Sequence, residues 1–302
     1  MDDMQDAIDR TGDAGEGASL WQKALAVSGA AALGLLAGFG AGILFPGGGR
    51  PVISRELPEP RSDALPEIMT SARTGAEAPL VVIDPGHGGF DPGASGEDGE
   101  REKDIVLALA IEVRDRLIEL GGVRVALTRD GDRFLPLEQR PQLAEALGAD
   151  AFISIHADSA PAPEAKGANV YVLSARASDR EAQALARIEN ESASGIGLPE
   201  GADDVALILA DLMKRETALG SAALSRALER ESQGRMPVHQ PFRRSANFVV
   251  LRSPEMASVL FEAGYLTNPD DANRLGDKAR RGAVAQALAN AILTHLLAPE
   301  TP

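Results

Sequence analysis

The sequence predicts an α/β protein with an open, mostly parallel, twisted sheet and helices on both faces, preceded by a transmembrane helix and a disordered linker. Short β-rich runs alternate with helical periods beyond residue 79, which is typical of a parallel sheet with helical crossovers. An uncharged apolar run at 24–45 and a Pro- and Gly-rich stretch at 46–78 precede this alternation. We therefore expect one folded domain, over 79–298, on a membrane tether.

The N-terminal region is expected to hold the chain at a membrane. Residues 1–23 are acidic and form a predicted disordered tail. The run at 24–45 is long enough to cross about 30 Å of hydrocarbon as a helix. A long acidic lead and the lack of an A-x-A-like site after Phe45 favour a retained signal anchor, and a cleaved signal peptide is the alternative. The stretch at 46–78 is then a linker.

Within the domain, apolar runs and their spacing define the elements in order. A run rich in β-branched residues makes 80–83 a strand, and apolar residues three and four apart make 106–120 a helix that ends at a Gly pair. The remaining strands are expected at 123–127, 152–155, 170–173, 248–251 and 259–261, and the remaining helices at 137–147 and 278–297. An insertion, about 178–234, carries two further predicted helices, at 178–191 and 203–231.

The composition excludes several classes of function. The 302 residues include 30 Lys and Arg against 45 Asp and Glu, a net charge of −15. The chain lacks the basic clusters that neutralise phosphates, so nucleic acid is not an expected partner. The absence of Cys excludes disulfides, Cys nucleophiles and thiolate zinc sites. Any metal must therefore be held by His and carboxylate side chains.

Two of the four histidines stand directly at the ends of predicted strands. His87 follows the strand at 80–83 within a Gly-rich loop, and His156 follows the strand at 152–155. Ligands of open α/β sheets bind beyond the carboxyl ends of the strands, so we expect both imidazoles in one crevice. Glu102, at the start of the next helix, would complete a His/His/Glu set of the kind that holds catalytic zinc. Each residue alone also fits a structural role, as a core or turn histidine or as an acid favoured by the helix dipole.

Several stretches together resemble a known enzyme family. VVIDPGHGGFDPGA, the acidic pair before KDIVLALA, LTR, AFISIHAD and FVVLRSPEMASVLFEAGYLTNP resemble, in order and spacing, the zinc-dependent N-acetylmuramoyl-L-alanine amidases of bacterial cell-wall turnover and daughter-cell separation. The resemblance covers 79–297 and implies a peptidoglycan substrate, cut at the amide between N-acetylmuramic acid and L-Ala of the stem peptide. It implies zinc, one ion per chain, on His87, Glu102 and His156. It makes Glu262 the catalytic carboxylate, which takes a proton from water and returns it to the leaving amine.

The sequence departs from this family's pattern at three positions. Asp158 and Glu145 stand where the family usually has Asn, and Tyr265 stands where it more often has Phe. None of the three is an implied metal ligand. The departures therefore bear on substrate contacts and leave the implied metal set intact.

The insertion at 178–234 resembles that of family members whose active site is blocked by a helix. In those members an activator, a coiled-coil protein with a degenerate LytM domain, displaces the helix. The resemblance implies that Glu189 occupies the zinc site, with Glu191 and Glu216 as the alternatives. We therefore expect an autoinhibited amidase in the periplasm, tethered to the inner membrane. The alternatives are a zinc peptidase or amidase acting on another substrate and an inactive wall-binding division scaffold, which would need a broken metal set.

Overall fold

The computed structural model describes residues 65–159, 165–192, 204–253 and 255–298. All of them belong to one compact unit, 63–302. The predicted acidic tail, the apolar span at 24–45 and the linker up to residue 64 lie outside the described residues. The end of the predicted linker, 65–78, is not disordered, because Met69 exchanges two backbone hydrogen bonds with Val125 of the sheet. Among the residues that are described, no helix is both long enough and apolar enough to span a membrane.

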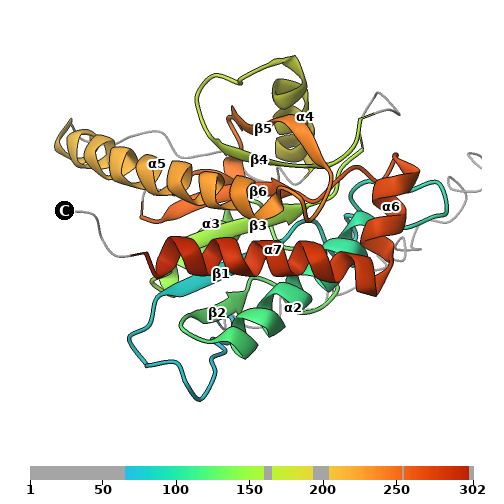
Figure 1. The fold of residues 1–302 in the computed structure, drawn as a ribbon. Helices are drawn as coiled ribbons and strands as arrows, with labels where there is room; N and C mark the ends of the chain where they lie inside the picture. The colour runs from blue at the N-terminus through green and yellow to red at the C-terminus, as the bar shows by residue number, and fades with distance from the viewer. Residues whose placement is uncertain (1–64, 160–164, 193–203, 254, 299–302) are drawn as a thin grey trace, which may run out of the picture. The chain divides into compact units, whose positions relative to one another are not determined.

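The described residues form six strands and six α-helices around a single sheet (Figure 1). The strands are β1 (Leu80–Pro85), β2 (Arg124–Leu127), β3 (Ala151–His156), β4 (Ala168–Leu173), β5 (Val238–Ala246) and β6 (Ala257–Glu262). The helices are α2 (Glu102–Leu120), α3 (Gln139–Ala146), α4 (Arg180–Ser192), α5 (Asp204–Ser232), α6 (Pro269–Gly276) and α7 (Lys278–Leu296), with a 3₁₀ helix at Val249–Leu251.

The sheet is mixed and mostly parallel, in the order β2-β1-β3-β6-β4-β5. Strands β2, β1, β3 and β6 run parallel to one another, whereas β4 is antiparallel to β6 and parallel to β5. The carboxyl ends of β1, β3 and β6 therefore meet at one edge of the sheet. In the register between β3 and β6, His156 lies opposite Glu262.

The sheet is covered by helices on both faces, as the alternation of elements predicted. Alternate residues of a strand point to opposite faces, so Val81 and Ile83 pack in one core with residues of α2, α5 and α7. Leu80 and Val82 pack in a second core with residues of α3, α4 and the 3₁₀ helix. Figure 1 shows α2, α5 and α7 together in front of the sheet. The site described below lies at the end of the sheet between these two layers.

One predicted strand was wrong, and one strand was not predicted. The run at 248–251 contains the 3₁₀ helix, and the strand is β5, which lies just before it and forms the edge of the sheet beside β4. β5 carries polar residues, including Arg243 and Arg244, so no apolar alternation marked it. Phe248, Val250 and Leu251 are buried in the second core. A short apolar run reports burial and cannot by itself distinguish a strand from another buried segment.

The other predicted elements are confirmed to within a few residues. The insertion contains the two expected helices, α4 and α5. α2 begins at Glu102, among the acidic residues expected to open it. The side chain of Asn268 accepts hydrogen bonds from the backbone N–H groups of Asp270 and Asp271 and so caps α6, which begins at Pro269.

Candidate metal centre

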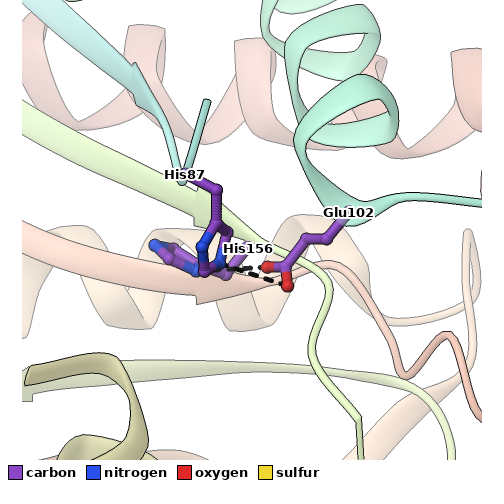
Figure 2. A group of neighbouring side chains, drawn as sticks. All are labelled: His87, Glu102 and His156. Carbon is purple, nitrogen blue, oxygen red and sulfur yellow. Dashed lines mark ion pairs between the residues drawn. The ribbon is translucent and has the colours of Figure 1, made fainter. Parts of the chain in front are cut away.

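Three residues singled out in the sequence meet at the carboxyl end of the sheet. His87 follows β1, His156 ends β3, and Glu102 begins α2. One ligand atom from each lies within 4.8 Å of the other two, and Figure 2 shows the three side chains converging from three different elements. Their exposed fractions are 5% for His87, 0% for Glu102 and 2% for His156. The two histidines and Glu102 therefore meet as predicted, in a buried His–Glu–His group.

Two glycines allow the loop after β1 to lie against these ligands. A Cβ atom at Gly86 would lie 2.5 Å from Cε1 of His156, and one at Gly93 would lie 2.6 Å from Oε2 of Glu102. Neither distance is tolerated between non-bonded heavy atoms, so both positions require Gly. His87 itself has a φ of 57°, a left-handed conformation that is uncommon for a residue with a side chain. The close approaches at Gly86 and Gly93 and the left-handed backbone of His87 together determine where the His87 imidazole lies.

Two of the three ligands, His87 and Glu102, are oriented by further hydrogen bonds. Nδ1 of His87 lies 2.9 Å from Oδ2 of Asp91. Oε2 of Glu102 accepts from the N–H of Ala94, and Oε1 accepts from the N–H of Ala157, both at 2.8 Å. A carboxylate behind a histidine fixes the ring orientation and leaves the other nitrogen to bind a metal. The Asp91 contact therefore presents Nε2 of His87 to the centre of the group.

The ligand atoms fit a bound cation. Nε2 of His87 and Nδ1 of His156 are buried and form no hydrogen bond within the described part of the chain, although each lies 3.2 Å from a Glu102 oxygen. Burial alone would lower the pKa of both histidines. At His87 the charge of Glu102 and the hydrogen bond with Asp91 outweigh burial and raise the pKa. At His156 the charge of Glu189 and the contact with Glu102 do the same. Without a metal the group thus favours protonated imidazoles, and a metal ion would take the place of those protons. Two imidazoles and one carboxylate are ligands of catalytic zinc.

Glu262 lies beside the group, on the neighbouring strand. It ends β6 opposite His156, and its side chain is fully buried. Oε2 accepts a hydrogen bond from the N–H of Asp158 at 3.2 Å, whereas Oε1 has no hydrogen-bond partner among the described residues. Burial raises the pKa of Glu262 well above its ordinary value, and the nearby Asp158, Glu102 and Glu189 carboxylates raise it further. A carboxylate whose pKa is raised binds a proton more readily than an ordinary Glu, which is the property that a general base and acid needs.

Of the two departures nearest the site, Asp158 brings a carboxyl group and Tyr265 brings a hydroxyl. Burial raises the pKa of Asp158 to about 7, and the charges of Glu102 and Glu189 act in the same direction. The hydroxyl of Tyr265 accepts a hydrogen bond from Asn169 and donates one to Oε1 of Glu181, on α4, at 3.3 Å. Tyr265 therefore connects the sheet to the first helix of the insertion.

Glu189 reaches the metal group from α4. Its side chain is buried, and Oε2 lies 3.3 Å from Nδ1 of His156 and 3.9 Å from Nε2 of His87. Of the two alternatives, Glu191 is exposed and lies 3.7 Å from Arg187, and Glu216 is exposed on α5. The structure therefore brings Glu189 to the site and leaves Glu191 and Glu216 at the surface.

Two carboxylates that orient the site were missed at the sequence level. Asp91 contacts the His87 ring, and Asp84 is a fully buried residue of β1. Both stand in the stretch VVIDPGHGGFDPGA that carried the resemblance. The signal was therefore present, but the contact of Asp91 depends on how the loop after β1 folds, and the contacts of Asp84 depend on residues of β3 and α3 that only the tertiary fold brings to it.

Comparisons with known proteins agree with the geometry. A family model described as N-acetylmuramoyl-L-alanine amidase matches residues 81–294. The chain is 40% identical over 226 residues to the N-acetylmuramoyl-L-alanine amidase AmiA of Salmonella typhimurium, which covers 74% of this chain and 78% of the relative. It is 39% identical over 219 residues to AmiA of Escherichia coli, covering 72% and 75%. The solved structure of the amidase AmiC2 of Nostoc punctiforme superposes with a TM-score of 0.54 at 31% identity, covering 74% of this chain and 99% of that one.

Proposed function

The chain belongs to the N-acetylmuramoyl-L-alanine amidase family, and we propose that it hydrolyses the amide between N-acetylmuramic acid and L-Ala of the peptidoglycan stem peptide, with zinc on His87, Glu102 and His156. The observation that carries this proposal is the buried His–Glu–His group beside a Glu262 oxygen on the adjoining strand that has no hydrogen-bond partner within the described part of the chain. By hydrolysing this amide, the enzyme would act in cell-wall turnover and daughter-cell separation.

Zinc is the metal that this set of ligands favours. The chain has no Cys, and two imidazoles with one carboxylate leave a tetrahedral ion an open position. A zinc ion bound there would supply Lewis-acid chemistry, polarising the scissile carbonyl and making a water molecule more acidic. The hydrogen bonds from the Nδ1–H of His87 to Asp91 and from two backbone N–H groups to Glu102 hold these two ligands in place for it.

Glu262 is the proton carrier in this proposal. Its Oε1, which no described residue hydrogen-bonds, would accept a proton as the oxygen of water bonds to the carbonyl carbon. The same proton then passes to the nitrogen of L-Ala as the C–N bond breaks, so that a carboxylate and a free amine leave the site. Burial and the neighbouring carboxylates raise the pKa of Glu262, so this residue holds an accepted proton more strongly than an ordinary Glu until it passes to the nitrogen.

Glu189 is the proposed regulatory residue. A carboxylate within 3.3 Å of a metal-ligand nitrogen would fill the open position and exclude both water and substrate. α4 would then act as a lid, displaced by a coiled-coil activator with a LytM domain. We also propose that the run at 24–45 tethers the enzyme to the inner membrane, so that the domain works in the periplasm.

The other two functions are less well supported. An inactive wall-binding or division scaffold needs a broken metal set, and all three ligands and Glu262 lie together in this chain. A zinc peptidase or amidase acting on another substrate has the same metal site, and so only the product distinguishes it.

The test uses the full chain in detergent with purified sacculi. We expect stoichiometric zinc and slow release of intact stem peptides that carry a free L-Ala amine, identified by mass spectrometry. Glu189→Ala should raise the rate about tenfold or more, because a closed lid favoured by about 1.4 kcal/mol leaves roughly one molecule in ten open.

Glu191→Ala is the matched control, since Glu191 is exposed on the same helix; its rate should not change. Equal rates for the parent chain and Glu189→Ala would show that α4 is not a lid. Zinc without release of stem peptides from either protein would point to another substrate.

A further inference from the structure

Two buried guanidinium groups lie beneath the loop that carries His87. Arg140, on α3, donates from Nη1 to the carbonyl oxygen of Pro85 at 2.9 Å and from Nη2 to that of His87 at 2.8 Å. Arg129 donates from Nε to Pro85 O at 2.9 Å and from Nη2 to Gly86 O at 2.7 Å. Both side chains are almost fully buried. The backbone carbonyls of three consecutive residues, from the end of β1 into the loop, are thus held by this arginine pair.

The contact at His87 lies where the backbone most needs support. His87 has a φ of 57°, and a residue with a side chain holds this conformation only when its surroundings fix it. Arg140 binds the carbonyl of that same residue. The imidazole direction follows from the backbone direction at the same Cα atom, so the guanidinium acts on the ligand through the main chain.

The counter-charge of Arg140 connects this loop to the strand of the second histidine. Nη1 of Arg140 lies 2.9 Å from Oδ1 of Asp84, and Oδ2 of Asp84 accepts a hydrogen bond from the Ser154 hydroxyl at 2.7 Å. Ser154 lies on β3, two residues before His156. One buried set of polar contacts therefore joins the loop of His87 to the strand of His156.

We propose that Arg140 is a positioning residue for the metal site, which fixes the geometry of His87 relative to His156 through Pro85 O, His87 O and Asp84. Arg140 does not contact a ligand atom of the His–Glu–His group. Its effect is on metal affinity and coordination geometry. The inference depends on the proposed function only in that the site holds a metal.

A Lys at this position separates charge from geometry. Lys keeps the positive charge opposite Asp84, but a single ammonium cannot reproduce the planar fork that binds two carbonyls and a carboxylate together. Arg281 offers a matched control for the same substitution. It is buried, pairs with Glu112 at 2.7 Å and donates to Leu275 O at 2.7 Å, at the end of α6.

The experiment compares Arg140→Lys with Arg281→Lys in the full chain. Zinc Kd is measured by competition with a chelator, the visible spectrum of the Co²⁺-substituted protein reports coordination geometry, and thermal unfolding of the metal-free protein reports folding. Arg140→Lys should weaken zinc binding by about 10- to 100-fold, as other partners behind metal ligands do, and change the Co²⁺ spectrum. Arg281→Lys should leave both unchanged even where it lowers the unfolding midpoint.

A second variant covers the case in which Arg140→Lys does not fold. The double change Asp84→Asn with Arg140→Gln removes both charges of the buried pair, which costs less than leaving one charge alone, and it should weaken zinc binding to the same degree. Parental zinc Kd and Co²⁺ spectrum in either folded variant would overturn the positioning role, as would equal weakening in Arg281→Lys. A parent chain that binds no zinc would instead overturn the proposed metal centre itself.

Discussion

Asp84 and Glu262 are carboxylates near the carboxyl ends of two strands in one sheet, both fully buried, yet their surroundings are opposite. Asp84 accepts hydrogen bonds at Oδ1 from Thr128 and Arg140 and at Oδ2 from Ser154. Glu262 accepts one bond, from the N–H of Asp158, and its Oε1 has no partner among the described residues. The same functional group is saturated in one strand and left open in another.

This difference distinguishes a carboxylate that supports the fold from one that can exchange a proton. Burial alone would raise the pKa of Asp84, but the Arg140 charge and the hydroxyls of Thr128 and Ser154 outweigh it and hold that pKa below its ordinary value. Burial raises the pKa of Glu262, and neighbouring acids, Asp158 first among them, add to that effect. Asp84 therefore remains charged and supports the loop, whereas Glu262 is available to exchange a proton.

The largest expected effect is on turnover, at Glu262. Glu262→Gln should lower kcat on sacculi by about 10²- to 10⁴-fold, because an amide of the same shape cannot accept the proton. Zinc content should stay stoichiometric, since the residue is not among the three ligand residues. Glu255→Gln, an exposed change ahead of β6, serves as the control. Both variants are made in the Glu189→Ala chain, whose active site is expected to be open. A kcat for Glu262→Gln close to that of the Glu189→Ala chain alone would show that another group accepts the proton.

Next in size is a loss of stability, at Asp84. Asp84→Asn leaves the Arg140 guanidinium buried without its counter-charge, and breaking such a pair costs about 3–5 kcal/mol in the free energy of unfolding. Urea unfolding of the metal-free protein measures this cost. Asp150→Asn, at an exposed carboxylate that accepts one backbone hydrogen bond from Leu80, should cost far less. Equal losses of unfolding free energy in the two variants would mean that the buried Asp84–Arg140 pair stabilises the protein no more than an exposed carboxylate with one hydrogen bond.

The groups that surround Asp84 and Glu262 could not be predicted from the sequence. The strand ends were predictable, because apolar runs locate β1, β3 and β6 and a parallel register brings their ends to one edge. His87, His156 and Glu262 follow from that register. Glu102 follows from the start of the next helix, since a helix after β1 begins at the same edge.

The partners of the site residues could not be predicted in the same way. Arg140 lies in a helical period where an Arg is expected to be solvated, and only the tertiary fold buries it beneath β1. Glu189 came from the resemblance and not from its own residue pattern, because a polar helix end is ordinarily solvated. β5 lacked apolar alternation at the edge of the sheet, and the buried run after it was mistaken for a strand.

A third prediction concerns the pH dependence of stability in the metal-free protein. Because the pKa of Glu262 is higher in the folded than in the unfolded chain, the folded form binds more protons between the two values. Stability is then lost as the pH rises through that interval, by about 1.4 kcal/mol per pH unit for this group. Glu262→Gln removes the loss, so this variant and the parent should be equally stable near pH 4 and the variant more stable at pH 8. A difference of opposite sign would show that the folded environment favours the charged carboxylate.

The smallest effect tests a single hydrogen bond to Asp84. Ser154→Ala removes one donor of three, and a hydrogen bond to a charged group contributes about 1.5 kcal/mol or somewhat more. Ser258→Ala on β6 is the matched control, because that buried hydroxyl donates to a neutral acceptor, Met256 O, at 3.1 Å, where about 1 kcal/mol is expected. The pH dependence of the lost stability distinguishes Ser154→Ala from Ser258→Ala. The pKa of Asp84 is lowered by folding, so the contribution of Ser154 should be present at neutral pH and lost as Asp84 becomes protonated in acid, whereas that of Ser258 should not change. Urea unfolding of both variants at neutral and acidic pH measures this, and an equal, pH-independent loss in the two would mean that Ser154 stabilises the strand without supporting the Asp84 charge.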